Sequence, residues 1–211
     1  KALNLDKPGW KEYIETLSTV SGIKISDFAS LKEALALRIE HFAENGCKAS
    51  DHGLDKMVFV RAEEAALDAI IEKGLSGVAV ADKEADALKT ELIIFCATEY
   101  KKRGWVMQIH YNCMRNPNSK MFELLGADTG FDIIGPDNGS RKLALLLDAL
   151  NKEDNLPKTV LYSLDASDNE FLDTLLGAFQ GTEIPGKLQH GSAWWFNDNK
   201  QGMKDQLTSL A

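Results

Sequence analysis

The residues best suited to chemistry lie in the segment 105–115, WVMQIHYNCMR, where a short apolar run ends in His110, Asn112 and Arg115. A histidine moves protons near neutral pH, an amide both donates and accepts hydrogen bonds, and a guanidinium offers a carboxylate two parallel donors. The three types together indicate a site for a polar substrate, with His110 as a catalytic candidate and Asn112 and Arg115 as binding candidates. A buried core histidine and a loop-bracing arginine are the alternatives.

Two further candidates, the adjacent residues Asp51 and His52, lie near the end of the strand-like segment 47–53. We interpret them as a polar pair at a strand end, with His52 as a second catalytic candidate and Asp51 as a binding residue. An aspartate at such a position is also typical of turns and caps, so a structural role for Asp51 stays open.

The segment 187–198 ends in GSAWWFND, which contributes Trp194, Trp195 and Asp198. An aromatic face suits the apolar side of a sugar, so both tryptophans are candidate substrate contacts, although packing in the core explains one of them equally well. Asp198 either contacts hydroxyl groups or caps the last helix, which is the common role of aspartate before a helix.

Helices separate the strands that carry these residues. Apolar periodicity predicts strands at 47–53, 105–111, 159–164 and 187–193, and helices at 10–17, 31–45, 61–75, 82–103, 141–150, 169–179 and 202–210. Ser30 is placed to cap the second helix and Gly46 to end it. A short extended piece at 57–60 and a long loop at 116–140, which surrounds the helical turn MFELLG at 121–126, complete the pattern.

Strands that alternate with helices predict an α/β fold with a parallel sheet, whose carboxyl ends lie on one side. Reactive residues at four strand ends favour a (β/α)₈ barrel over an open sheet with one switch point. Such a barrel needs about 250 residues, and this chain has 211 residues with four convincing strands. We therefore expect part of a barrel at 46–211 and a helical segment at 1–45 packing on it.

The composition of the chain argues against some classes of binding partner. The formal charge of −8 argues against nucleic acid and anionic membranes, which need a basic face. Three cysteines without a pairing pattern indicate reduced thiols. No apolar run approaches the roughly 20 residues that span a bilayer, and the first residues do not read as a signal peptide, so we expect a cytoplasmic protein.

Five segments in order resemble the uronate (glucuronate) isomerase family: SDHGLD at 50–55, QIHYNCMRNPN at 108–118, ADTGFDIIG at 127–135, LPKTVLYSL at 156–164 and GSAWWFNDNKQGM at 191–203. The resemblance implies an amidohydrolase-like (β/α)₈ barrel to which this chain supplies strands four to seven. It implies an isomerase that converts D-glucuronate to D-fructuronate and D-galacturonate to D-tagaturonate.

The resemblance also implies a divalent metal, expected to be zinc, bound by a His-x-His pair and an aspartate that this sequence lacks. His110 matches a fifth-strand histidine of the superfamily, which places it near that metal. A small uronic acid is the expected partner, and a homo-oligomer is compatible with the family. A non-catalytic fragment and a metal-dependent hydrolase of the same superfamily are the alternatives.

Overall fold

A computed structural model describes residues 1–135, 139–192 and 195–210. The chain divides into two compact units, one formed by Lys1–Lys48 with Val58–Arg103 and the other by Ala49–Met57 with Gly104–Ala211. The expected packing of a helical segment 1–45 on a barrel part 46–211 stays a prediction.

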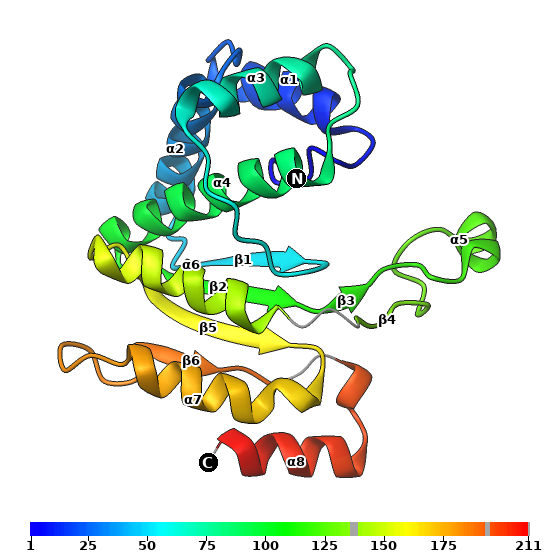
Figure 1. The fold of residues 1–211 in the computed structure, drawn as a ribbon, viewed down its shortest axis with the longest axis vertical. Helices are drawn as coiled ribbons and strands as arrows, with labels where there is room; N and C mark the ends of the chain where they lie inside the picture. The colour runs from blue at the N-terminus through cyan, green and yellow to red at the C-terminus, as the bar shows by residue number, and fades with distance from the viewer. Residues whose placement is uncertain (136–138, 193–194, 211) are drawn as a thin grey trace. The chain divides into compact units, whose positions relative to one another are not determined.

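The first unit is helical and contains α1 (Trp10–Ser21), α2 (Phe28–Glu44), α3 (Glu64–Leu75) and α4 (Asp82–Arg103), as Figure 1 shows. Its core is apolar and includes fully buried Leu31, Leu88 and Leu92. The helices form where the periodicity predicts them. α1, α2 and α3 each place an apolar stripe in this core, whereas α4 has buried residues on more than one side. Within the described range 1–135, residues 57–60 belong to no helix or strand, and the short extended piece expected there stays a prediction.

The start of α2 differs in detail from the prediction. Asp27 is the N-cap, and its carboxylate accepts a hydrogen bond from the backbone N–H of Ser30 at 2.8 Å. The Ser30 hydroxyl in turn accepts from the backbone N–H of Asp27 at 3.1 Å. Ser30 is therefore the third helical residue of a capping box rather than the cap itself.

The second unit is built on a parallel sheet of β1 (Ala49–Leu54), β2 (Val106–Tyr111), β5 (Lys158–Ser163) and β6 (Leu188–His190), in that spatial order (Figure 1). All three neighbouring pairs run parallel. The predicted α/β fold with a parallel sheet is confirmed, and its four strands are those that the sequence predicts, to within a few residues.

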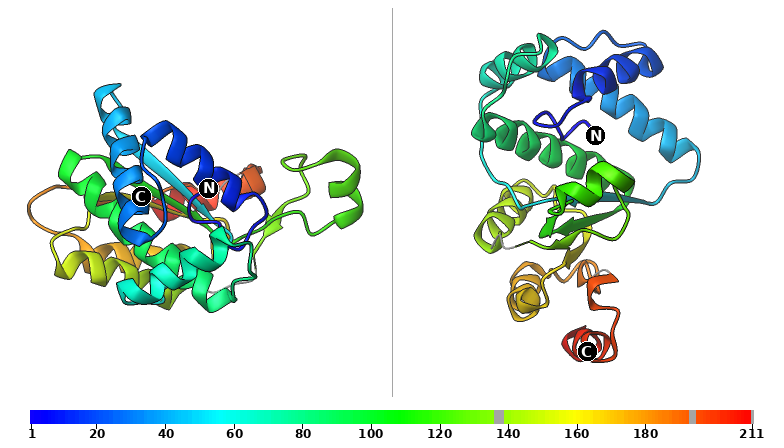
Figure 2. Two further views of the ribbon diagram at one scale, coloured as in Figure 1. Left: turned by 90° about the horizontal axis from the view of Figure 1, so that it is seen from above. Right: turned by 90° about the vertical axis from the view of Figure 1, so that its right-hand side faces the viewer.

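The two faces of the sheet have different surroundings. Met107, Ile109 and Tyr111 are buried, whereas the residues between them are half-buried and point to the other face. The helices α6 (Ser140–Lys152) and α7 (Asn169–Phe179) lie on the same side of the sheet, as Figures 1 and 2 show. Because Asp168, directly before α7, meets Ser163 of the buried face, that face is the one toward the helices.

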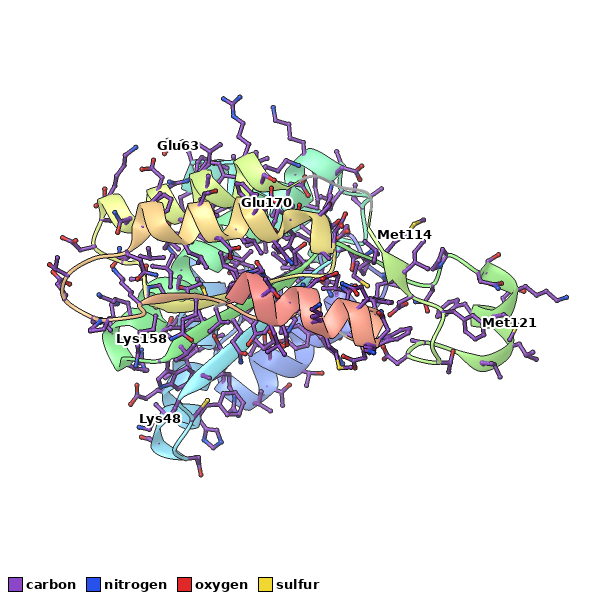
Figure 3. All side chains as sticks on the ribbon, turned by 90° about the horizontal axis from the view of Figure 1, so that it is seen from below. Lys48, Glu63, Met114, Met121, Lys158 and Glu170 are labelled. Carbon is purple, nitrogen blue, oxygen red and sulfur yellow. The ribbon has the colours of Figure 1, made fainter. Side chains whose placement is uncertain are left out.

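An arm leaves the sheet after β2. It consists of β3 (Cys113–Met114), α5 (Ser119–Leu125) and β4 (Ile133–Ile134), with β3 and β4 antiparallel. Figure 3 labels Met114 and Met121 on this arm, which projects away from Lys158 at the amino end of β5. The sequence predicts a loop here, and the two-residue strands were missed because they are too short to show periodicity.

The chain closes with α8 (Lys200–Leu210) after a 3₁₀ turn at Trp195–Asn197. Cys47, Cys96 and Cys113 are free thiols, as expected. Within the described ranges, no helix has the length and apolar character required to cross a membrane.

Candidate functional site

A cavity of about 360 Å³ opens at the carboxyl ends of β1 and β2. Its lining residues are Asp51, Gly53, Leu54, Asp55, His110, Tyr111, Cys113, Arg115 and Leu164. The parallel sheet thus brings together three of the predicted site residues, namely Asp51, His110 and Arg115. The shared direction of the strands explains this meeting, because residues at the ends of parallel strands lie on one side of the sheet.

His110 and Asp51 form a hydrogen-bonded pair. The distance from His110 Nδ1 to Asp51 Oδ1 is 2.7 Å. The pair forms across the β1–β2 register, in which Gly53 is opposite His110 and Asp51 is opposite Gln108, so both side chains are on the same face. A carboxylate can only accept, so Nδ1 donates the hydrogen of this bond, and Nε2 is the ring nitrogen that can exchange a proton with a substrate.

Tyr162 completes this face, and sequence reasoning missed it. Its ring stacks on the His110 ring with centroids 4.1 Å apart and an interplanar angle of 8°. Its hydroxyl donates to Gln108 Oε1 at 2.7 Å. Burial, with a smaller contribution from the charge of Asp51, raises the pKa of Tyr162. Two features of the sequence relate to Tyr162. Gln108 and His110 alternate onto one face of β2, and Gly191, which begins GSAWW, leaves space for a neighbouring ring.

Arg115 is held by acidic side chains of the arm. Its Nη1 lies 2.7 Å from Asp132 Oδ2 and 3.5 Å from Asp128 Oδ1. Asp132 also accepts from the backbone N–H of Asn116 at 2.9 Å. Burial disfavours the charged guanidinium, but the Asp132 hydrogen bond and the nearby negative charges outweigh it and raise the pKa of Arg115. The guanidinium is therefore fixed in orientation and permanently charged.

A second cavity of about 360 Å³ adjoins Arg115. It is lined by Arg115, Asp128, Gly130, Asp132 and Trp195. The Trp195 side chain is exposed, and its ring packs against Phe196 with centroids 4.3 Å apart. The structure therefore brings Trp195 and Arg115, two of the candidate substrate contacts, to one cavity. Trp194 lies outside the described residues.

His52 lies on the opposite face of β1 from Asp51, since side chains alternate along a strand. Its register partner is Ile109, a fully buried residue of the helix-covered face. Burial lowers the pKa of His52 to about 4, which makes the ring neutral at pH 7. The prediction that His52 and Asp51 form a pair at one site was therefore wrong.

Asn112 is also directed away from the cavities. It is 2% exposed, adopts a positive φ of 73°, and places Nδ2 3.5 Å from Asp168 Oδ2. The same carboxylate oxygen accepts from Ser163 Oγ at 2.6 Å. Burial, followed by the charge of Asp168, raises the pKa of Tyr111 beside this cluster. These contacts give Asn112 a role in joining the end of β2 to the start of α7.

Asp198 is exposed, and its backbone N–H donates to the Trp195 carbonyl at 3.1 Å. The cap of α8 is Asn199, whose Oδ1 accepts from the Gly202 N–H at 2.9 Å. The side chain of Asp198 is thus one residue too early for the capping role that the sequence left open.

The side chains that could bind a metal ion are too few at this site. Throughout the described part of the chain, no three or more His, Cys, Asp or Glu side chains are grouped to hold a metal ion. His110 with its Nδ1 on Asp51 has the carboxylate–histidine arrangement common among metal ligands, but one histidine does not make a metal site. The described residues do not fit a complete metal centre.

Known proteins resemble this chain over its whole length. A family model described as glucuronate isomerase (UxaC) matches residues 1–211. The uronate isomerases of Lachnoclostridium phytofermentans and Lachnospira eligens are 49% and 47% identical over 211 residues, each match covering 100% of this chain and 45% of the relative.

Two crystal structures share the fold. Uronate isomerase from Thermotoga maritima has a TM-score of 0.88 at 32% identity, covering 99% of this chain and 45% of that one. Glucuronate isomerase from Caulobacter crescentus has a TM-score of 0.85 at 25% identity, covering 99% and 42%. The chain spans a little under half the length of the relatives it matches. On the match across all of its residues, the chain belongs to the glucuronate isomerase family.

Proposed function

We propose that this chain forms part of a uronate isomerase that interconverts D-glucuronate with D-fructuronate and D-galacturonate with D-tagaturonate. The observation that carries the proposal is the His110–Asp51 pair, 2.7 Å apart, in a polar cavity at the carboxyl ends of parallel strands. An oriented imidazole beside an open cavity is a group with which an aldose–ketose isomerase can move a proton.

The proposed architecture is a (β/α)₈ barrel to which β1, β2, β5 and β6 contribute strands four to seven. Their spatial order follows the chain order without a reversal, and α6 and α7 lie on one side of the sheet. An open doubly wound sheet would reverse its strand order and carry helices on both faces. This one-directional winding supports the barrel.

The reaction moves hydrogen between neighbouring carbons. The C2 proton leaves, O1 gains a proton to give an enediol, C1 then gains a proton and O2 loses one. In our proposal His110 Nε2 takes the proton from C2 and delivers it to C1, while Asp51 keeps Nδ1 protonated and stabilises the imidazolium between the two steps.

Arg115 is the proposed partner of the substrate carboxylate, with Trp195 against the carbon chain. Both line the cavity that adjoins His110's site through Arg115. Asp132 occupies one edge of the guanidinium through Nη1, so it orients Arg115 as well as offsetting part of its charge.

A divalent metal, expected to be zinc from the family resemblance, would have its ligand set outside the residues described. No step above passes through it. We also propose that the protein acts in the cytoplasm on a small uronic acid, without nucleic acid or membrane as a partner, and that a homo-oligomer is compatible with this function.

The test uses the full-length protein and the variant His110→Asn. Asparagine retains a donor for Asp51 but has no basic nitrogen, so we expect kcat for D-glucuronate to fall about 10²- to 10⁴-fold with an unchanged melting temperature. The matched control is His41→Asn, on the exposed surface of α2, which should leave kcat unchanged.

Product analysis completes this test. Fructuronate formed in D₂O should carry deuterium at C1, because a proton held on an imidazole exchanges with solvent. Turnover of His110→Asn within threefold of the unaltered protein would remove His110 from the mechanism, and a hydrolysed product in place of fructuronate would overturn the assigned reaction.

A further inference from the structure

We propose that Tyr162 is a positioning residue that holds the imidazole of His110 in one plane for proton transfer. The inference rests on the proposed function, to which it adds a residue. Tyr162 lies beside His110 in the β2–β5 register and meets it ring to ring at 4.1 Å and 8°. A nearly parallel stack allows the imidazole little rotation out of its plane.

The Tyr162 ring is itself held at its far end. Its hydroxyl donates to Gln108 Oε1 at 2.7 Å, and Gln108 is two residues before His110 on the same strand and face. Tyr162 therefore contacts two residues of β2: its hydroxyl bonds to Gln108 and its ring stacks on His110. Removing the hydroxyl loosens the support, whereas removing the ring abolishes it.

Two glycines flank this pair of rings. A Cβ at Gly191 would lie 2.0 Å from Tyr162 Cε1, so the ring occupies the space that a side chain would fill. On the other side, Gly53 is the register partner of His110, and, its two chain neighbours apart, no atom of the described residues lies within 4 Å of a Cβ built there. One face of the imidazole is thus covered by Tyr162, and the β1 side opens to the cavity.

Asp51 alone does not restrain the ring in this way. Its hydrogen bond fixes which nitrogen carries the proton, but the ring can still tilt about that bond. The Asp51 side chain is 58% exposed, so solvent competes for the same oxygen. Stacking on Tyr162 restricts the tilt, and the two contacts together aim Nε2. A displacement of about 1 Å in such a group is sufficient to cost about 100-fold in rate.

The test compares three variants of the full-length protein. Tyr162→Leu removes the stack and should lower kcat for D-glucuronate about 10- to 100-fold, with KM within twofold, because binding contacts are untouched. Tyr162→Phe retains the stack and should recover most of that loss. Val160→Ala, on the same strand and face but opposite Gln108, is the matched control and should leave kcat unchanged.

A second readout does not depend on turnover. In protein with ¹⁵N-labelled histidine, the His110 ring signals should be sharp in the unaltered protein and in Tyr162→Phe. In Tyr162→Leu they should be broadened by exchange between ring orientations, because Asp51 still fixes the tautomer but the ring can tilt. Tyr162→Leu with unaltered kcat and unaltered His110 signals would overturn the positioning role. Absence of isomerase activity in the unaltered protein would overturn the proposed function, and the ring signals would then decide the role of Tyr162 by themselves.

Discussion

Replacing Gly191 by alanine should destabilise the protein through a single rigid contact. The added Cβ would lie 2.0, 2.2 and 2.5 Å from three carbon atoms of the Tyr162 ring. The nearest of these falls about 1.5 Å short of the separation at which carbon atoms pack favourably, roughly 3.5 Å. The ring cannot yield by turning a flexible end, because it stacks on His110 and donates to Gln108.

The loss of stability in Gly191→Ala can be estimated from the contacts that must change. Forcing an extra methyl group into a packed site costs about 1–3 kcal/mol, and losing the tyrosine hydrogen bond adds about 1 kcal/mol. The expected loss is therefore about 2–4 kcal/mol in the free energy of unfolding. At roughly 2–4 °C per kcal/mol for a protein of this size or larger, the melting temperature should fall by about 4–16 °C.

Gly53→Ala is the matched control for this prediction. Gly53 lies in the same register row, on the other side of His110, and the described atoms leave open space around its Cβ position. Alanine there should be neutral or stabilising by about 0.4–1 kcal/mol, because the unfolded chain loses freedom. Urea unfolding of both full-length variants measures the difference. Equal stability of Gly191→Ala and Gly53→Ala would refute the reasoning.

Two further predictions concern His52 and Arg115. The pKa of His52 is about 4 in the folded protein and 6.5 in the unfolded chain, so the unfolded state binds more protons between these pH values and stability falls as the pH falls. Urea unfolding should show a loss of about 2 kcal/mol in the free energy of unfolding from pH 7 to pH 5, and His52→Gln should abolish this loss. The same pH dependence in His52→Gln would contradict the assignment. Arg115→Ala should raise KM for D-glucuronate about 10- to 100-fold while kcat falls less, as expected for a lost charged hydrogen bond, and an unchanged KM would leave Arg115 as a brace for Asp132.

Much of the architecture follows from local patterns. Alternation along 106–111 and 158–163 predicts strands, and apolar residues at helical spacing predict α6 and α7, because both patterns record which side chains must be buried. The two strands of the arm did not follow, since two-residue strands have no period, whereas the helical turn at 121–126 corresponds to α5.

The site was predictable in part. His110, Asp51 and Arg115 could be placed at one end of the sheet, because parallel strands share a direction. Asp51 and His52 look like a pair in the sequence, yet their side chains point to opposite faces. The role of Asn112 could not be predicted either, because its partner Asp168 lies 56 residues further along the chain.

The sequence by itself therefore determined the order of strands and helices, the edge at which the polar residues gather and, through its motifs, the family. Only the tertiary structure decided which of those residues meet. Asp51 reaches His110 across 59 residues, and Tyr162 stacks on it across a second strand pair. The physical reason is register: a shift of one residue between neighbouring strands turns every side chain to the other face, and local sequence does not encode that alignment.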